Sequence, residues 1–331
     1  MNPSVPATHV RHQHGPHDPA DQQRWAIELS GVVKKFTALR GSRLALDGLD
    51  LHVPMSGVHG FLGRNGSGKS TTIRALVGLT RIDSGSMRIF GRPVPEQLPE
   101  VIEQVGAIVE RPRFVPEFSA RRNLLLLATA SGTPRHRVEQ VLAETGLAER
   151  ADDRCKTYSL GMKQRLAISA TLLKDPQLLI FDEPTNGLDP EGIADVRAMV
   201  RRLGRSGRAV LVSSHLLAEI EQIADTVSVI NAGRLVAEGP LSSLLSGDTT
   251  VEVVVAEPFL AADVLRGGGW QVEHDSDRLL VSGSGRPEQI SQLLAEHRLY
   301  PSHLGRTRAG LEDAYLRLTG AAPDHRGGQV A

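Results

Sequence analysis

The sequence has few of the features that would place it outside a cell or inside a membrane. Its 331 residues include one cysteine, Cys155, which rules out an intrachain disulfide and fits a reducing compartment. The first residues contain no apolar segment of the kind found in signal peptides, so we expect a cytoplasmic protein. No apolar run approaches the roughly 18 residues of a membrane helix. Any membrane role would therefore need a separate partner.

Net charge is absent as well. The chain has 38 Lys and Arg against 38 Asp and Glu, so its formal net charge is zero. This balance gives no support for a broad nucleic-acid or anionic-membrane surface, although a local basic patch stays open. We expect no nucleic-acid partner. Apolar residues make up 40% and charged residues 23%, as in ordinary globular proteins, and the length allows two domains with tails.

Both ends of the chain predict disordered tails. Residues 1–24 are rich in Pro, His, Asp and Gln and poor in large apolar side chains. Four histidines in this segment offer a metal site as the alternative, but their spacings match no usual metal pattern, which favours a solvated tail. These histidines are His9, His12, His14 and His17. Residues 321–331 form the second predicted tail.

Residues 25–246 show the rhythm of an α/β domain. "WAIELSGVV" and "RLALDGLDLHV" alternate apolar and polar residues, as antiparallel strands do. Short Val, Ile and Leu runs follow, several separated by helical stretches: "GVHGFLG", "QVGAIVE", "QLLIFDEP", "RAVLVSSH" and "TVSVINAGRLVAEG". The pattern predicts a mainly parallel sheet with an antiparallel edge. Residues 115–165 lack strand signals and predict an inserted helical subdomain.

After about residue 247 the order of elements changes. The pattern β-α-β-β-α-β over residues 247–320 predicts a small α+β domain of the ferredoxin-like type. We expect a last helix, "LEDAYLRLTG", to close this domain. The small α+β domain holds no catalytic constellation. It can be a regulatory or dimer-contact domain, a ligand sensor, or a stabilising appendage, and the sequence leaves these open.

"GRNGSGKS" fits the phosphate-loop pattern G-x-x-x-x-G-K-[ST], between an apolar strand and a helix. In such loops the backbone N–H groups and the helix N-terminus surround the phosphates of a nucleotide. We expect Lys69 to reach the β- and γ-phosphates and Ser70 to bind Mg²⁺. The nucleotide-binding residues predicted here are Gly63, Arg64, Asn65, Gly66, Ser67, Gly68, Lys69, Ser70 and Thr71.

A second strand, "LLIFDEP", ends in two acidic residues. Asp182 suits the Mg²⁺ shell, as a Walker-B acid does. Glu183 could activate water as a general base. Taken alone, this pair could also be a solvated loop, but the phosphate loop favours the catalytic interpretation.

"YSLGMKQRL" raises a different question. Ser159 is a good helix N-cap, and small residues at Ser159 and Gly161 allow a close approach of an anion. The chain thus has a second phosphate-binding feature that its own phosphate loop does not need.

Together, "GRNGSGKS", "YSLGMKQR", "LLIFDEPTNGLDP" and "VSSH" resemble the ATPase subunits of ABC transporters, over roughly residues 25–245. The resemblance implies that Ser159 and Gly161 cap the γ-phosphate of ATP held by a second, head-to-tail subunit. Asp189 then links the two composite sites, and His215 contacts the γ-phosphate as the switch histidine. Phe36 takes the place of the aromatic that stacks on adenine, with a core aromatic as the alternative.

Two departures from that pattern concern Glu110, which stands where the family usually has Gln, and the signature, which has Leu160 and Met162. We expect Glu110 to hold Mg²⁺ or its water. With both departures and the terminal "LEDAYLRLTG", the chain is similar to one subgroup, the single-domain ATPases of bacterial drug-resistance, bacitracin and lantibiotic-type exporters. Those ATPases pair with a separately encoded permease. "RPRFVPEFSARRNL" would then form part of a groove for a permease helix, or else an ordinary surface loop.

The resemblance therefore implies an ATP- and Mg²⁺-dependent ATPase that works as a head-to-tail dimer, which we expect to be a homodimer, at the cytoplasmic face of the membrane. It would power the export of a drug, antibiotic, peptide or lipid-like substrate. The alternatives are an importer ATPase and an ABC ATPase of DNA repair or translation. The second usually has long coiled coils, zinc-binding cysteines or two ATPase domains, and none is visible here.

Overall fold

The protein is described here from a computed structural model. The structure describes residues 25–38, 41–110, 113–245, 250–275, 278–283, 286–307, 311 and 315. The tails predicted for residues 1–24 and 321–331, including the four histidines, lie outside the described residues. Among the described residues, no helix combines the length and apolar character needed to cross a membrane.

An antiparallel sheet of four strands opens the fold, in the order β2-β1-β4-β5. Its strands are β1 (Trp25–Ala38), β2 (Gly41–Pro54), β4 (Ser84–Ile89) and β5 (Arg92–Pro93). The two stretches predicted as antiparallel strands are confirmed as β1 and β2, which pair from Trp25 opposite Pro54 to Ala38 opposite Gly41. The alternation has its physical basis in burial, since Ile27 and Leu29 face the core.

The central sheet has six strands in the order β10-β9-β3-β8-β7-β6. They are β3 (Gly57–Leu62), β6 (Val105–Ile108), β7 (Leu178–Asp182), β8 (Ala209–Ser214), β9 (Thr226–Asn231) and β10 (Arg234–Pro240). All neighbours pair in parallel except β9 and β10, which form an antiparallel hairpin. The predicted parallel sheet is therefore confirmed, and its continuous apolar runs follow from burial on both faces.

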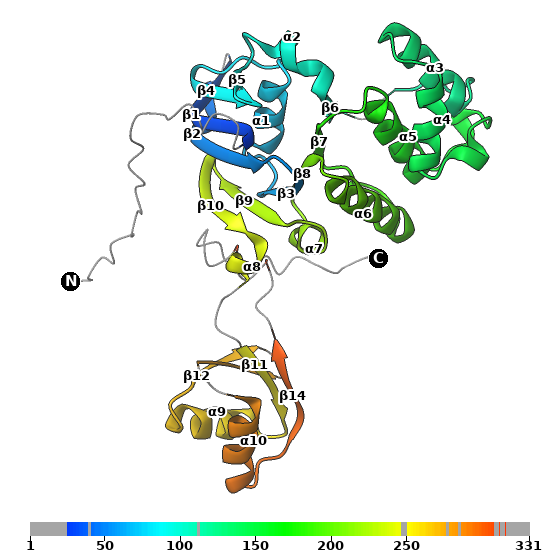
Figure 1. The fold of residues 1–331 in the computed structure, drawn as a ribbon. Helices are drawn as coiled ribbons and strands as arrows, with labels where there is room; N and C mark the ends of the chain where they lie inside the picture. The colour runs from blue at the N-terminus through cyan, green and yellow to red at the C-terminus, as the bar shows by residue number, and fades with distance from the viewer. Residues whose placement is uncertain are drawn as a thin grey trace.

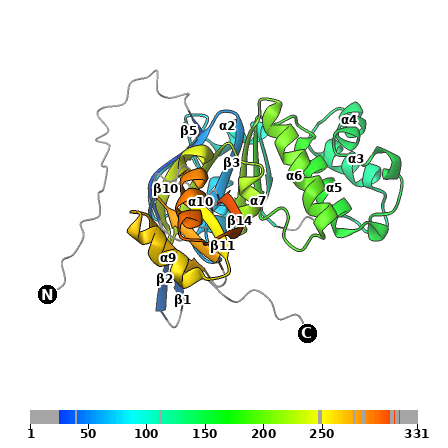
Figure 2. The same cartoon turned by 90° about the horizontal axis from the view of Figure 1, so that it is seen from below.

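Two hydrophobic clusters cover the two faces of the central sheet. Alternate residues of β7 divide between them: Leu178 and Ile180 join the cluster with α1 (Lys69–Leu76) and β1–β2. Leu179 and Phe181 join the cluster of the helices on the other face. Figure 1 shows α1 beside the antiparallel strands. Figures 1 and 2 show α3–α6 grouped on the opposite side of the larger unit.

That second group contains the predicted helical subdomain. Its helices are α3 (Ala120–Ala130), α4 (His136–Glu144) and α5 (Leu160–Leu172), with 3-10 turns at Ala148–Arg150 and Cys155–Thr157; α6 (Pro190–Arg205) packs against α5. Shorter helices are α2 (Leu98–Val101), followed by the 3-10 turn Ile102–Gln104, α7 (Leu217–Glu221) and α8 (Leu241–Leu244). The predicted start of a helix after Ser159 is confirmed, because the Ser159 hydroxyl accepts a hydrogen bond from Met162 N–H at 3.2 Å.

The small C-terminal unit is a four-stranded antiparallel sheet with two helices. It comprises β11 (Thr250–Val255), α9 (Pro258–Gly267), β12 (Gln271–Asp275), β13 (Arg278–Ser282), α10 (Pro287–Glu296) and β14 (Pro301–Thr307). The sheet order β12-β13-β11-β14 is that of the ferredoxin-like split unit, as the sequence predicted. It has a hydrophobic cluster of its own, and Figure 1 shows it apart from the larger unit.

The residues after β14 differ from expectation. We expected "LEDAYLRLTG" to close the small C-terminal sheet. Instead Leu311 and Tyr315, its two described residues, are buried in the large cluster with Ile220 of α7. The backbone N–H of Leu311 donates to Glu221 Oε2 at 3.2 Å. An apolar stripe indicates that a helix will be buried but not against which core, so the sequence could not assign Leu311 and Tyr315 to the large cluster.

Topology brings three strand ends together. β3, β8 and β7 are parallel neighbours, so their carboxyl ends lie along one edge of the sheet. β3 leads into the phosphate loop, β7 ends at Asp182, and His215 follows β8. This edge is where a site formed by all three must lie.

Candidate functional site

The loop between β3 and α1 has no room for side chains at two of its glycines. A Cβ on Gly63 would lie 2.5 Å from both Ser67 Oγ and the carbonyl oxygen of Ile230. At Gly68 the φ angle is +118°, and a Cβ would meet the carbonyl oxygen of Ala45 at 2.8 Å. Glycine is therefore required at both positions, and the bare backbone can follow a bound phosphate closely.

Lys69 is the first residue of α1 and is buried beneath the loop. Its ammonium donates to the carbonyl oxygen of Gly63 at 2.6 Å and lies 3.4 Å from Glu183 Oε1. The other carboxylate oxygen of Glu183 is 2.6 Å from Nδ1 of His215. Lys69, Glu183 and His215 thus form one connected cluster, although each follows a different strand.

Ser213 holds the two acidic residues at the end of β7. Its hydroxyl donates to Asp182 Oδ1 at 2.5 Å and accepts from the backbone N–H of Glu183 at 2.9 Å. Glu183 has a φ angle of +50°, in the left-handed region that non-glycine residues rarely adopt. Such strain persists only where the surroundings enforce it, and it clusters at functional sites. The bonds from Ser213 provide part of that enforcement.

An open pocket of about 270 Å³ lies beside this cluster. It is lined by Phe36, Arg43, Ala45, Asn65, Gly66, Gly68, Lys69, Ser70, Thr71, Glu183 and Asn186. Phe36 is 46% exposed, so its ring is a surface that another flat ring can cover rather than a core residue. Arg43 pairs with Phe36 across the β1–β2 hairpin, and its guanidinium donates to the carbonyl oxygen of Gly66 at 3.0 Å.

The pocket suits a nucleoside triphosphate with a divalent cation. Lys69 and Arg43 supply positive charge beside a loop of bare backbone, which favours a polyphosphate. The Ser67 hydroxyl is buried in the loop without a hydrogen-bond partner among the described residues. The Ser70 hydroxyl and the Asp182 carboxylate are the oxygen donors that Mg²⁺ prefers. Ser70 lines the pocket, and Asp182 is the last residue of β7, directly before Glu183 of the same lining.

Three predicted residues lie outside this pocket and on the helical side of the molecule. Ser159 caps α5, and Gly161 packs against Gly192 of α6, where a Cβ on Gly161 would lie 3.5 Å from the Gly192 Cα. Asp189 caps α6 by accepting a hydrogen bond from Gly192 N–H at 3.0 Å. Figure 1 shows the start of α5 well apart from α1. Within one chain, these residues and the phosphate loop do not form one site.

Glu110 also lies outside the pocket lining. Its side chain is 74% exposed, and one carboxylate oxygen lies 3.4 Å from the guanidinium of Arg74, on α1. The structure therefore does not bring Glu110 to Ser70 and Asp182, and its role as a metal ligand stays a prediction.

Comparison with known proteins identifies the family of the chain. Residues 46–186 match the family model described as "ABC transporter". The chain is 35% identical over 307 residues to the bacitracin transport ATP-binding protein BcrA of Bacillus licheniformis, covering 88% of this chain and 98% of that protein. It is 36% identical over 327 residues to the daunorubicin/doxorubicin resistance ATP-binding protein DrrA of Streptomyces peucetius, covering 92% and 96%.

The chain belongs to the ABC transporter family. Among solved structures, cbiO1 from Clostridium perfringens, part of the ABC transporter complex cbiONQ, shares the fold with a TM-score of 0.60 at 24% identity, covering 74% of this chain and 94% of cbiO1. As an ABC ATPase, the chain binds and hydrolyses ATP, and the pocket beside Lys69 is where its phosphate loop lies.

Sequence reasoning missed three residues of the site. Arg43 has no motif of its own and becomes visible only through the pairing of β1 with β2. Ser213 is part of "VSSH", but its role is not visible in that motif, because its hydrogen bond to Asp182 depends on the register that places the two residues opposite each other in β7 and β8. Asn186 lies in the turn after Glu183 and lines the pocket, but the sequence pattern assigns a role only to the two acidic residues before it.

Proposed function

We propose that this ABC ATPase powers an exporter through a separately encoded permease. The carrying observation is the Lys69–Glu183–His215 cluster, which joins a phosphate-binding cation, a carboxylate and an imidazole at one edge of the sheet. The relatives are named for bacitracin transport and for daunorubicin/doxorubicin resistance. Resistance carried by an ATP-driven transporter is explained most simply by export of the drug. The substrate class proposed here is a drug, antibiotic, peptide or lipid-like molecule.

Each residue of the pocket takes a role that its position supports. The phosphate loop from Gly63 to Thr71 would surround the phosphates and Phe36 would stack on adenine. Ser70, in the pocket lining, and Asp182, at the end of β7, would hold Mg²⁺. Glu183 accepts the proton of the attacking water, while His215 keeps the carboxylate in place and faces the γ-phosphate. Mg²⁺ supplies charge stabilisation on the phosphates when it is bound.

A head-to-tail pair of chains explains the residues that lie outside the pocket. Ser159 is exposed at the N-terminus of α5, where the helix dipole favours an anion. Since the phosphate loop of the same chain is on the far side of the molecule, the anion is the γ-phosphate held by a partner chain. Asp189, at the N-terminus of the adjacent α6, lies between the two proposed sites.

The helical subdomain offers a surface for the permease at the membrane. Val115, Leu126 and Leu127 are each more than 40% exposed, although they are large and apolar. Asn123 fixes the loop beside them, because its side-chain amide accepts from Val115 N–H at 2.9 Å and donates to the Val115 carbonyl oxygen at 3.2 Å. A rigid loop with exposed apolar side chains fits a helix of an integral membrane protein. The chain would then work at the cytoplasmic face of that membrane.

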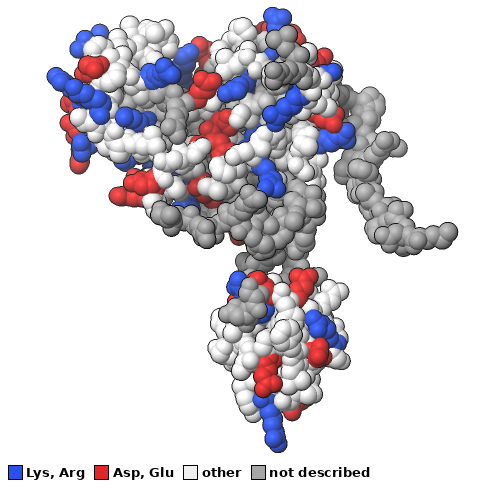
Figure 3. Space-filling model, turned by 180° about the vertical axis from the view of Figure 1, so that it is seen from behind, with Lys and Arg blue, Asp and Glu red and all other residues white. Residues whose placement is uncertain are grey.

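Charge gives no reason to prefer nucleic acid as a partner. Figure 3 shows Lys and Arg interspersed with Asp and Glu over the face that it presents. The exporter proposal therefore stands on the site and on the apolar surface of the helical subdomain.

Replacing Glu183 by Gln tests the proposed chemistry. The variant should bind ATP as the wild type does, while turnover falls by about 10²-fold or more, because the proton acceptor is lost. ATP binding by fluorescence titration and phosphate release measured on the same preparation separate the two effects. Near-normal hydrolysis would remove Glu183 from the proposed role.

The export function needs a cellular test. Disrupting the gene should raise retention of the transported compound in intact cells, and the wild-type gene should restore export while the Glu183→Gln gene should not. A panel containing bacitracin and daunorubicin covers the compounds for which the two relatives are named. Uptake that falls on disruption would instead identify an importer.

A further inference from the structure

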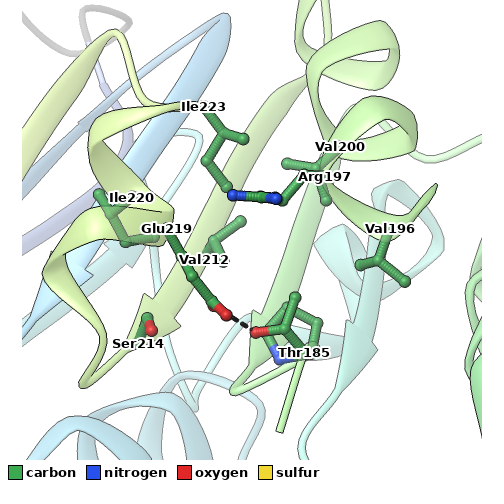
Figure 4. A pocket seen from close by; sticks show the side chains of 10 residues that line it. Thr185, Val196, Arg197, Val200, Val212, Ser214, Glu219, Ile220 and Ile223 are labelled. Atoms are coloured by element: carbon green, nitrogen blue, oxygen red, sulfur yellow. Dashed lines mark hydrogen bonds between the residues drawn. The ribbon is translucent and has the colours of Figure 1, made fainter. Parts of the chain in front are cut away.

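A small cavity lies beside the turn that follows Glu183, with Pro184 and Thr185 in its lining. Its volume is about 10 Å³, close to the lower limit for one water, and it lies between the turn after β7, α6, β8 and α7. Figure 4 shows Thr185 and Glu219 pointing toward each other across it. The Thr185 hydroxyl donates to Glu219 Oε2 at 2.5 Å, and both residues are more than 90% buried.

The hydrogen bond from Thr185 is the main polar contact of the buried Glu219 carboxylate. Glu219 forms no ion pair with any Lys, Arg or His in the described part of the chain. Arg197 also lines the cavity, but its guanidinium donates to Gln222 at 2.5 Å. A carboxylate buried in this way is costly without a hydrogen bond, so the Thr185–Glu219 contact is strongly favoured.

Each partner belongs to a segment that carries a catalytic group. Thr185 lies two residues after Glu183, in a turn where Asn186 N–H donates to the Glu183 carbonyl oxygen at 3.2 Å. Glu219 is in α7, which begins two residues after His215, and its own N–H donates to the Leu216 carbonyl oxygen at 3.2 Å. Thr185–Glu219 therefore joins the Glu183 turn to the His215 segment at a point away from the reacting groups.

We propose that Glu219 is a positioning residue that acts through Thr185 to hold Glu183 and His215 at their working separation. The proposal rests on the role proposed for Glu183. The strained backbone of Glu183, with φ at +50°, needs support from more than one side. Ser213 gives support on the sheet side through its bonds to Asp182 and Glu183. Thr185–Glu219 gives it on the helix side.

Thr185→Val tests this, because valine keeps the shape of threonine and removes the hydroxyl. We expect kcat for ATP hydrolysis to fall roughly tenfold or more, since small misplacements of catalytic groups carry losses of that order. KM for ATP should stay within about twofold, because the pocket lining does not include Thr185. Thr185→Ser keeps a hydroxyl and should restore most of the loss.

The matched control is Thr145→Val in the helical subdomain. Thr145 is also a buried threonine, and its hydroxyl lies 2.7 Å from that of Ser169, far from the pocket. It should change thermal stability as Thr185→Val does but leave kcat unaltered. Equal losses of kcat in both valine variants would show a general effect of destabilisation and overturn the proposal.

Glu219 variants keep the proposal testable if Thr185→Val does not fold. Glu219→Gln retains an acceptor oxygen and should hold kcat within about threefold, whereas Glu219→Ala should match the loss expected for Thr185→Val. Equal activity of the Gln and Ala variants contradicts the proposal. Glu183→Gln is assayed alongside. If Glu183→Gln still hydrolyses ATP, the proposed function fails; if it is inactive while Thr185→Val retains wild-type kcat, only the positioning role fails.

Discussion

His59 is a buried histidine in β3, the strand that leads to the phosphate loop, and it is 1% exposed. Its Nδ1 lies 2.8 Å from the Thr226 hydroxyl, and its Nε2 lies 2.8 Å from the Ser228 hydroxyl. Ser228 gives its proton to Glu238 at 2.6 Å, so Nε2 carries the ring proton and Nδ1 accepts from Thr226. The neutral ring thus satisfies both hydroxyl partners with a single ring proton.

Burial lowers the pKa of His59 from 6.5 to about 4, because the charged ring loses its water; the Glu238 carboxylate opposes this and His52 adds to it. The unfolded chain therefore binds more protons between these values than the folded chain does. The stabilisation is fully present above pH 6.5 and is lost as the pH falls toward 4.

Unfolding measured between pH 4.5 and 6.5 checks this sign. The wild type should lose roughly 2–3 kcal/mol across this window from His59 alone. His59→Gln, which cannot titrate, should show a shallower slope. His136→Gln, at an exposed position in α4, is the control and should keep the wild-type slope. Parallel slopes for the wild type and His59→Gln would contradict the burial argument. Glu238, whose pKa is lowered from 4.5, begins to titrate at the lower edge of this window, and it is present in all three proteins compared.

At the scale of elements, the start of α5 is the feature whose purpose one chain does not explain. Its N-cap is intact and its second residue, Gly161, has room for a Cβ at ordinary contact distance. The glycine is therefore not demanded by packing within the chain. The proposed contact with a phosphate held by a partner chain would account for this glycine.

Mixing two inactive variants tests this element directly. Gly161→Asp should nearly abolish hydrolysis, because a negative charge then faces the γ-phosphate, and the loss of such stabilisation typically costs about 10²–10³ in rate. Lys69→Ala should be equally inactive, because it removes the cation of the phosphate loop. A mixed dimer carries one site with both defects and one site without either.

Single-turnover hydrolysis should therefore return in the mixture, with mixed dimers verified by cross-linking. Gly161→Ala is the control for disruption of α5, because the structure has room for its Cβ. The thermal stabilities of the Gly161→Ala and Gly161→Asp variants are compared. Verified mixed dimers without any activity would count against a site shared between chains.

The elements were also the level at which the sequence was most informative. The phosphate loop, the acidic end of β7 and the histidine after β8 were predicted, because each follows a short apolar strand and parallel strands end at one edge. The contacts between them were not. Thr185–Glu219 joins residues 34 positions apart, and Ser213–Asp182 depends on the register of β7 and β8. Such pairings are set by the packed fold and leave no local pattern.

At the scale of the whole molecule, part of the hydrophobic core of the large unit comes from residues that follow the small C-terminal unit in the sequence. Leu311 and Tyr315 follow β14 yet share the cluster that contains Ile220 and Leu241. The boundaries 25–246 and 247–320 remain a prediction, but these two residues belong energetically to the ATPase unit.

Tyr315→Ala should destabilise the ATPase unit by about 3–5 kcal/mol, as loss of a buried aromatic ring commonly does. The thermal transition that ATP raises reports on that unit. Tyr300→Ala, at a tyrosine 71% exposed before β14, is the control and should leave that transition unchanged. Similar effects of the two substitutions would show that Tyr315 does not support the ATPase core.

The return of Leu311 and Tyr315 sets an order of events during synthesis. A ribosome releases the chain from its N-terminus, so the small sheet emerges in full before the last two members of the large cluster do. The small C-terminal unit can therefore fold before the hydrophobic cluster of the ATPase unit is complete. A chain cut or stalled between residues 245 and 311 keeps every catalytic residue but lacks Leu311 and Tyr315. The apolar surface that these two side chains cover beside α7 would then be exposed to chaperones and proteases.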